Sequence, residues 1–585
     1  MALPLGLGKA NLVANELVRR AMADPSLSLT IITALTLEKP RAGGGIERRF
    51  MEPFVERVFG GYPELLYAAA LRDGSLPDNI RVMEFFFQAG QWLNVPRAQQ
   101  NYISANYTHA GRYVLDAGVN VVAQLVAPGD GAGYSLSCNP DLTTDLLDAR
   151  RDGRARFLMV GEVNGELPFM GGHAEVPAGE FDHVLEGPAA GFPLFGPPNQ
   201  PVSLAHYAIG FRIAALVPDG GTLQIGIGAL GDSIAHALIL RHTRNDAYRA
   251  VLDALEIRGE RHDEPFREGL YGCSEMIADA FLALLEAGVV AREVEGRAIH
   301  AAFFLGSRDF YRRLRELAPE VRARIGMTAV TYVNELYGGE DGKRAARRHA
   351  RFANSAMMAT LLGAAVSDGL EDGRVVSGIG GQYNFVAQAF ALGNDARSIL
   401  AVNATRSRGG KRTSNILWSY GHVSVPRHLR DMVVTEYGIA DLRGRCDAEV
   451  AAAMLAVADA AFQEPLLAKA KAAGKLPAAF ALPDAARANT PERLTAALAP
   501  LRDRGLLPPF PFGTDFTPVE QRLLPALRRL QGAGPRDLAG FAWRGMAGGD
   551  DPAEAEALAR LSLGAPDSLK ERVYAALVRG AMRGT

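Results

Sequence analysis

The segment TLQIGIGALGDSIAHALIL, residues 222–240, indicates the class of fold. It begins with apolar, β-favouring residues, continues through the glycine motif G-x-G-x-x-G at residues 226–231, and ends with the apolar spacing of a helix. A strand, a tight glycine turn and a helix form the unit from which parallel α/β sheets are built. A similar segment at residues 4–21, PLGLGKANLVANELVRRA, predicts a second copy of this unit. No strand is expected ahead of Gly6, because the sequence begins there.

Further apolar runs, separated by helical stretches, extend the pattern along most of the chain. Near-continuous apolar runs are typical of strands that are buried on both faces of a parallel sheet. We therefore predict an α/β fold with two open parallel-sheet halves. The predicted strands lie at residues 29–37, 120–128, 155–163, 222–228, 298–306, 374–380 and 398–404.

Two changes in composition divide the chain into domains. Residues 187–201, GPAAGFPLFGPPNQP, contain five prolines and no periodicity, which predicts a linker. From about Cys446 onward, Ala- and Leu-rich helical segments broken by prolines predominate. The predicted parts are an N-terminal α/β domain (1–186), the linker, a C-terminal α/β domain (202–446) and a helical extension (447–585).

Within the extension, the segment FTPVEQRLL predicts the start of a helix. Thr517 can cap the first turn, Pro518 suits the first helical position, and Glu520 completes a capping box. We identify no chemistry in this extension and interpret it as scaffolding.

The overall composition excludes several classes of function. The net charge of −2 for 585 residues gives no reason to expect a nucleic acid or an anionic membrane as partner. Three widely separated cysteines form no CxxC pair, which favours a cytoplasmic location. The eleven histidines form no metal-binding motif, so no metal site is predicted. The N-terminal segment lacks a signal peptide's apolar core, and no stretch approaches the ~18 apolar residues of a membrane span.

One glutamate stands out in the stretch GLYGCSEMIADAFLALLEAG, residues 269–288. The apolar residues recur with helical spacing, so we predict a turn followed by an amphipathic helix whose first turn holds Glu275. A glutamate there is favoured by the helix dipole by roughly 0.3–1 kcal/mol, which is sufficient explanation for the residue taken alone. The neighbouring Cys273 is interpreted as a buried core thiol rather than a nucleophile. The apolar positions of the predicted helix are Met276, Ile277, Ala280, Phe281, Leu284 and Leu285.

Two glycine-rich loops are candidate binding sites for anions. GIGALG, residues 226–231, indicates a phosphate-bearing ligand, since backbone N–H groups and a helix N-terminus meet there. A dinucleotide is disfavoured, because Asp246 does not follow a strand and is a poor ribose ligand. SGIGGQYNF, residues 377–385, follows a predicted strand and exposes N–H groups suited to an anion or oxyanion. The basic run at residues 343–352 is interpreted as a solvated helix face.

Several of these segments together resemble the acetyl-CoA hydrolase/transferase family, which includes acetate and 4-hydroxybutyrate CoA-transferases. The most specific is VVTEYGIADLRGR, residues 433–445, which resembles the C-terminal signature of that family. The resemblance extends over about residues 110–470. The other segments agree in the order LVAPGDGAGYSLS (125–137), EVNGELP (162–168), TLQIGIGAL (222–230), GCSEM (272–276), AAFFLGSRDFY (301–311) and SGIGGQYNF (377–385).

The resemblance implies a specific reaction on two CoA-transferase-like halves. By position, Glu275 is the catalytic carboxylate that attacks an acyl-CoA, giving an acyl-glutamyl anhydride and then a glutamyl-CoA thioester. An acceptor carboxylate completes the exchange, so coenzyme A is a substrate and no cofactor is implied. The family also implies a homodimer. A long segment at residues 243–267 and the sequence VADAAF at residues 457–462 depart from the family pattern and leave the acceptor open.

The remaining site residues are likewise inferred from the resemblance. The second glycine loop is expected to contact the oxyanion and coenzyme A, and the first loop is expected to contact the coenzyme A chain, together with an asparagine ahead of the second loop. These residues are Gly378, Gly380 and Gly381 for the second loop, Gly226, Ile227, Gly228, Ala229 and Leu230 for the first loop, and Asn354.

Three alternatives to CoA transfer stay open at this point. Water in place of the acceptor would make the protein an acetyl-CoA hydrolase that uses the same glutamate. A nicotinamide-dependent oxidoreductase could be built on GIGALG. A non-catalytic CoA-binding protein would use the helical extension as its interaction surface.

Overall fold

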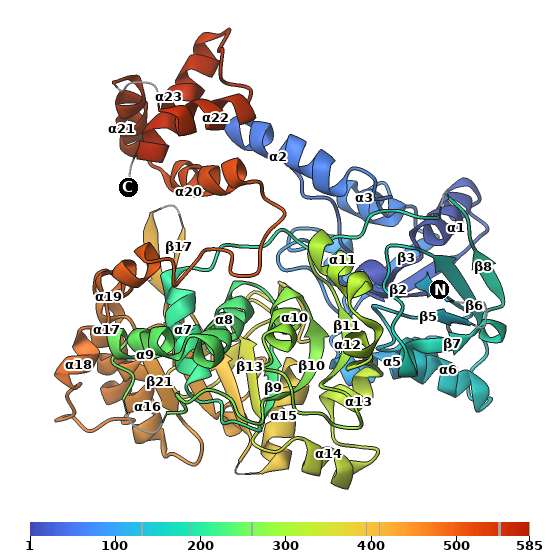
Figure 1. Ribbon diagram of the computed structural model, residues 1–585, viewed down its shortest axis with the longest axis horizontal. Coiled ribbons are helices and arrows are strands. Elements are labelled where there is room, and N and C mark those ends of the chain that lie inside the picture. The colour runs from blue at the N-terminus through green and yellow to red at the C-terminus, as the bar shows by residue number, and fades with distance from the viewer. Residues whose placement is uncertain are drawn as a thin grey trace. The chain divides into compact units, whose positions relative to one another are not determined.

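The chain folds into two compact units, which are described separately (Figure 1). The computed structural model describes residues 1–129, 133–188, 190–258, 261–393, 395–408, 410–547 and 551–583. The first unit consists of Met1–Leu37, Pro63–Ala404 and Ser414–Gly513. The second consists of Glu38–Tyr62, Thr405–Thr413 and Thr514–Thr585.

The first unit contains two eight-stranded sheets, and the first sheet lies in the N-terminal half. Six of its strands are parallel, in the order β3-β2-β1-β4-β6-β8, and two short antiparallel strands, β5 (Gly133–Ser135) and β7 (Glu175–Pro177), extend from β4. The parallel strands are β1 (Ala2–Leu5), β2 (Leu29–Ala34), β3 (Ile80–Glu84), β4 (Val121–Pro128), β6 (Leu158–Val163) and β8 (His183–Leu185).

The N-terminal residues form a central strand of this sheet, so the prediction that no strand precedes Gly6 is wrong. All four residues of β1 are buried, and β1 pairs with both β2 and β4. Four residues are too few to display a period of their own, and their pairing with two neighbouring strands stabilises the extended conformation.

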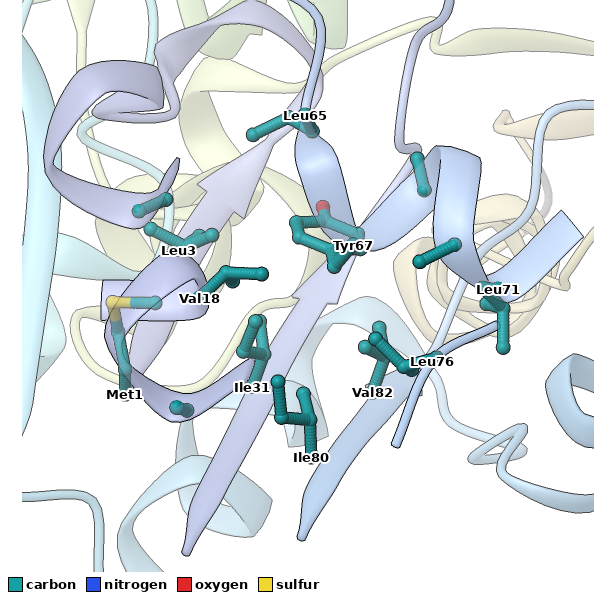
Figure 2. Close-up of a cluster of buried hydrophobic side chains, with 14 of the residues drawn as sticks. Met1, Leu3, Val18, Ile31, Leu65, Tyr67, Leu71, Leu76, Ile80 and Val82 are labelled. Atoms are coloured by element: carbon teal, nitrogen blue, oxygen red, sulfur yellow. The ribbon is translucent and has the colours of Figure 1, made fainter. Parts of the chain in front are cut away.

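The hydrophobic core of this half lies where β1, β2 and β3 pack against the helices α1 (Asn11–Ala23) and α3 (Leu66–Asp73) (Figure 2). Successive side chains along a strand point to opposite faces of the sheet, so every second apolar side chain faces the helices. The side chains labelled in Figure 2 are Met1, Leu3, Val18, Ile31, Leu65, Tyr67, Leu71, Leu76, Ile80 and Val82.

The second sheet has the strand order β12-β11-β10-β9-β13-β16-β20-β21, with all neighbours parallel except the antiparallel pair β20–β21. As in the first sheet, the strand numbers first decrease across the sheet and then increase. The change falls between β9 and β13, which remain parallel to each other. The two open parallel-sheet halves are therefore confirmed. The strands are β9 (Thr222–Ile225), β10 (Tyr271–Ile277), β11 (Ile299–Phe304), β12 (Ile325–Met327), β13 (Arg351–Ser355), β16 (Arg397–Ala401), β20 (Met432–Thr435) and β21 (Gly438–Asp441).

One predicted strand, residues 374–380, is not a strand. The backbone N–H groups of Val376 and Ser377 donate to the carbonyl of Asp368, at 2.7 and 3.2 Å, rather than to a neighbouring strand. The glycines that follow favour an irregular loop over an extended strand. The strand between β9 and β16 is instead β13, which was not predicted because its polar Arg351 and Asn354 interrupt the apolar pattern.

The interpretation of residues 343–352 as a solvated helix face is also wrong. The helix α14 (Glu340–Ala346) ends within this run, and both Lys343 and Arg347 are buried. The Lys343 ammonium donates to the carbonyls of Tyr337, at 2.6 Å, and Glu335, at 3.1 Å, because a buried cation requires acceptors. These cations therefore hold the loop that follows residue 334.

The predicted linker and two other segments considered above include residues outside the described part of the chain. The described residues of the predicted linker, 187–201, contain no helix or strand, and residue 189 lies outside the described residues. Residues 130–132 of the segment 125–137 and residues 259–260 of the segment 243–267 also lie outside them. The helices in the described part of the chain include none with both the length and the apolar composition of a membrane span.

The helical extension is confirmed as helical, and it contributes to both units. The helices α16 (Asp447–Ala456) and α17 (Ala460–Ala472) belong to the first unit, and α20 (Pro518–Gly532) belongs to the second. The capping box is confirmed at the start of α20: the Thr517 hydroxyl accepts from the Glu520 N–H, and the Glu520 carboxylate accepts from the Thr517 N–H.

Two helices of the second unit cross at glycines. On α21 (Pro535–Met546), a Cβ at Gly545 would lie 1.8 Å from the Ala576 carbonyl oxygen of α23 (Leu569–Arg583). A Cβ at Gly580 would lie 1.8 Å from the Phe541 carbonyl oxygen. The glycines thus allow the two backbones to touch.

We expect Gly580→Ala to destabilise the second unit by about 1–3 kcal/mol, because the methyl group would force α21 and α23 apart. Urea unfolding followed by circular dichroism measures this change. The control is Gly540→Ala on α21, where the nearest atom to an added Cβ is the flexible end of Arg544 at 3.7 Å. Equal stability of the two variants would show that the crossing is not tight.

Candidate active site

Glu275 lies on a strand, not in the first turn of a helix as predicted. It is near the carboxyl end of β10, and the following helix, α10 (Asp279–Glu286), begins only after Ala278. β10 pairs with β11 over most of its length and with β9 at its start. This pairing on both sides overrides the helical spacing of the apolar residues, and Met276 and Ile277 consequently belong to the strand. A helix dipole therefore does not account for Glu275.

The Glu275 carboxylate lies against an asparagine and a glycine loop. The Asn334 side-chain amide donates a hydrogen bond to Glu275 Oε2. A Cβ at Gly381 would lie 1.6 Å from the same oxygen and 2.2 Å from Asn334 Nδ2. A Cβ at Gly380, which has φ +54°, would lie 3.7 Å from Glu275 Oε1. Only glycine at position 381 leaves room for the carboxylate and the amide together.

The environment raises the pKa of Glu275 to about 7. The largest cause is burial, which disfavours the charged form; the hydrogen bond from Asn334 opposes it, and the negative charge of Asp141 adds to it. The carboxylate is therefore more basic than an ordinary one. A more basic carboxylate is a better nucleophile once it is ionised.

The second glycine loop is attached to the N-terminal half. The N–H of Phe87 donates to the Ser377 carbonyl at 3.1 Å, and the N–H of Gly90 donates to the Val376 carbonyl at 2.8 Å. A Cβ at Gly378 would lie 2.8 Å from the Phe86 ring. The segment that follows β3 thus sets the position of the loop that touches Glu275.

The first glycine loop lies at the carboxyl end of β9, beside the strand of Glu275. Gly228, with φ +87°, precedes α8 (Ala229–Thr243), so Ala229 and Leu230 belong to the first turn of that helix. The N–H of Gly226 donates to the Ala353 carbonyl at 3.2 Å. Ile227 is 47% exposed. The predicted strand, turn and helix are all present here.

Asn354 and Asn334 occupy different positions relative to Glu275. The Asn354 side chain, on β13, exchanges hydrogen bonds of 3.2 Å with the Gln224 amide on β9. The amide in contact with Glu275 is that of Asn334, the last residue of α13 (Val330–Asn334), which the sequence did not single out. No local pattern marks Asn334, because its partner is 59 residues away in the chain.

Three other residues with potentially reactive side chains are buried, and the two carboxylates among them accept hydrogen bonds from the backbone. Cys273 is fully buried, as expected of a core thiol. The buried Glu162 of the EVN segment accepts the N–H groups of Leu12, at 3.0 Å, and Val13, at 3.1 Å, at the start of α1. Glu436 of the C-terminal signature accepts the N–H of Ala404 at 2.8 Å. Within the described residues, no group of three or more His, Cys, Asp or Glu side chains is arranged to hold a metal ion.

Comparisons with known proteins find CoA-transferases that are similar to this chain. The family model of the acetyl-CoA hydrolase/transferase C-terminal domain matches residues 306–470, which include Asn334 and the second glycine loop. The 4-hydroxybutyrate coenzyme A transferase of Clostridium kluyveri is 27% identical over 358 residues, which are 60% of this chain and 72% of that protein. The butyryl-CoA:acetate CoA-transferase of Anaerostipes caccae is 25% identical over 366 residues, which are 61% and 72% of the two chains.

Solved structures share the fold. RipA from Yersinia pestis superimposes with a TM-score of 0.60 at 22% identity, over 81% of this chain and 94% of that one. A 4-hydroxybutyrate CoA-transferase from Porphyromonas gingivalis superimposes with a TM-score of 0.53 at 18% identity, over the same shares. Residues 306–470 thus match the acetyl-CoA hydrolase/transferase C-terminal domain, and the chain, which is similar to CoA-transferases, is an enzyme.

Proposed function

We propose that this enzyme transfers coenzyme A from an acyl-CoA to a carboxylic acid, with Glu275 as the nucleophile. The observation that carries the proposal is the Glu275 carboxylate, held by the Asn334 amide against the backbone of Gly381 at the carboxyl edge of the second sheet. Relatives named as CoA-transferases, from Clostridium kluyveri and Anaerostipes caccae, support it.

The first half-reaction moves coenzyme A onto the enzyme. Ionised Glu275 attacks the thioester carbonyl carbon, the C–S bond breaks, and an acyl-glutamyl anhydride and the CoA thiolate form. The thiolate then attacks the glutamyl carbonyl carbon and expels the first carboxylate, leaving a thioester between Glu275 and coenzyme A. The bond energy of the thioester is retained, so coenzyme A enters as a substrate and no cofactor is needed.

The second half-reaction reverses these steps with the acceptor. The acceptor carboxylate attacks the glutamyl thioester, releases the thiolate and forms a new anhydride. The thiolate attacks the acceptor's acyl carbon, and Glu275 departs as a free carboxylate. Backbone N–H groups of the loop containing Gly378, Gly380 and Gly381 would stabilise each tetrahedral oxyanion.

Coenzyme A would bind where the strand order of the second sheet reverses. Ligands of open α/β sheets bind outside the carboxyl ends of the strands at such a switch point, which here lies between β9 and β13. The turn at residues 226–228 follows β9, Ala229 and Leu230 begin α8, and Asn354 lies near the end of β13. Small residues in that turn let the coenzyme A chain approach the backbone and the N-terminus of α8.

The proposal is tested by trapping the thioester. The enzyme is incubated with acetyl-CoA, reduced with borohydride and digested, and Glu275 is expected to be recovered as its alcohol. Consumption of acetyl-CoA should require an added carboxylate. Consumption that is independent of any carboxylate would instead assign the enzyme as a hydrolase using the same glutamate, because water would then take the acceptor's place.

The pKa of Glu275 predicts the pH dependence of the free enzyme. Only the ionised carboxylate attacks, so kcat/KM should rise with pH up to about 7 and stay level above it. Below pH 7 the rate should fall about tenfold for each pH unit. Initial rates between pH 5 and 9 measure this profile, and a level rate down to pH 5 would contradict it.

We also propose that the protein works in the cytoplasm as a homodimer. Cys446 is an exposed free thiol, which persists best in a reducing compartment. The dimer is an expectation from the family resemblance, and size-exclusion chromatography with light scattering tests it. A mass of 62.6 kDa in solution would mean a monomer.

A further inference from the structure

A buried polar pair from the N-terminal half lies behind Glu275. Tyr107 begins the helix α5 (Tyr107–Asp116), and Asp141 precedes the helix α6 (Thr143–Arg151); each is 1% exposed. The Tyr107 hydroxyl donates a hydrogen bond to the Asp141 carboxylate. That carboxylate also accepts from Asn139 Nδ2 at 3.1 Å and from the Leu142 N–H at 2.8 Å. Its position is therefore set by three donors.

The backbones of this pair bind the two elements that touch Glu275. The N–H of Tyr107 donates to the Gly380 carbonyl at 3.0 Å, next to Gly381. The Asp141 carbonyl accepts from the Val330 N–H at 2.9 Å, at the first residue of the helix α13 that ends in Asn334. A single pair of residues thus fixes both the loop and the amide that contact the nucleophile.

A third link reaches the strand of Glu275 itself. The Tyr107 ring packs edge-on against the Phe303 ring, with centroids 5.9 Å apart. Phe303, on β11, is paired directly with Met276, the residue after Glu275. Tyr107 is therefore connected to Glu275 through the loop and through the sheet.

In the part of the chain that the structure describes, Asp141 forms no ion pair within 4 Å, and the three donors to its carboxylate are neutral groups of Tyr107, Asn139 and Leu142. Burial raises the pKa of Asp141, whereas these three hydrogen bonds and the charge of the buried Lys9 lower it. The Lys9 ammonium itself donates to the carbonyls of Gly6, at 2.9 Å, and Ala34, at 2.7 Å. Among the described residues, two titratable groups interact electrostatically with Glu275: the charge of Asp141 raises the pKa of Glu275, and the charge of Glu275 raises the pKa of Tyr107.

We propose that Tyr107 and Asp141 are positioning residues for the transfer reaction, by which the N-terminal half aligns Glu275 with Gly381 and Asn334 and places a second negative charge near its carboxylate. This inference rests on the proposed function. It gives the N-terminal half a part in a reaction whose nucleophile, Glu275, belongs to the C-terminal half.

Asp141→Asn tests the charge, because it preserves the shape and removes the negative charge. Without that charge, the ionised form of Glu275 is favoured, so the acid limb of the kcat/KM profile should move to lower pH by about one unit. At pH 8, where Glu275 is ionised in both enzymes, kcat should fall about tenfold, since its carboxylate is less basic and less well aligned. KM should change less than twofold.

Tyr107→Phe is the second variant, and it keeps the backbone bond to Gly380. Loss of the hydroxyl weakens the ionised form of Asp141, so the acid limb should move in the same direction by a smaller amount. The matched control is Glu162→Gln, another buried carboxylate of the same half, bound to the start of α1. This control should leave the acid limb in place, whatever it does to the melting temperature.

The outcomes separate this inference from the proposed function. If the wild-type enzyme forms the Glu275 thioester but Asp141→Asn leaves the acid limb unmoved, Asp141 is only structural and the inference is wrong. If both Asp141→Asn and Glu162→Gln move the limb equally, the effect is a general one and the inference is also wrong. If the wild-type enzyme forms no Glu275 thioester, the proposed function itself fails.

Discussion

Glu275→Gln is expected to lower kcat about 10³-fold or more while the protein keeps its fold. The amide has the shape of the carboxylate and its oxygen can still accept from Asn334, but it cannot attack a thioester and form an anhydride. Because burial disfavours the ionised carboxylate, its replacement by a neutral amide should leave the melting temperature unchanged or raise it. Steady-state kinetics with an acyl-CoA donor and thermal unfolding measure the two effects.

Cys273→Ala serves as the control for the neighbouring thiol. Cys273 is fully buried, so its replacement should lower stability modestly, by creating a small cavity, and leave kcat within a few-fold of wild type. Full activity of Glu275→Gln, or an inactive but folded Cys273→Ala, would falsify the assignment of Glu275 as the nucleophile.

Gly381→Ala, which adds a single methyl group in the active site, is expected to lower kcat strongly. Its Cβ would lie 1.6 Å from Glu275 Oε2 and 2.2 Å from Asn334 Nδ2, so the carboxylate or the amide must move. A displacement of about 1 Å in a reacting group can cost on the order of 10²-fold in rate. We expect a loss of that size in kcat, and we expect the borohydride-trapped product at Glu275 to be reduced in parallel.

A glycine of the same half provides the steric control for this variant. A Cβ at Gly342, on α14, meets nothing within 4 Å, and alanine is favoured over glycine in a helix. Gly342→Ala should therefore retain full activity and gain slightly in stability. If Gly381→Ala behaves like Gly342→Ala, the close contact between this loop and Glu275 does not exist in solution.

The parts of the fold that were predictable from sequence depend on contacts between residues close together in the chain. The strand, glycine turn and helix at residues 222–240 are such a case, since each element shows its own periodicity and the turn needs a glycine at φ +87°. The capping box at Thr517 and Glu520 spans three residues and formed as predicted. In both places local propensity and the final structure agree.

Where long-range pairing competes with local pattern, the predictions failed. Residues 271–277 show helical spacing yet form β10, because strands from distant parts of the chain flank them. Residues 351–355 are too polar to show as a strand, but they pair with β9 and β16. Residues 2–5 are too few to show any period. In each case the partner strand supplies the hydrogen bonds that the segment cannot supply itself.

The features of the active site likewise fall into those predicted from the sequence and those that only the tertiary structure shows. From the sequence came the α/β class, the two glycine loops and, through the family resemblance, the choice of Glu275. Only the tertiary structure placed Asn334 on that carboxylate, the Gly381 backbone against it, and the pair of Tyr107 and Asp141 behind it. The physical reason is distance along the chain. These residues lie 59 to 168 positions from Glu275, and no local pattern records which distant side chain a carboxylate will meet.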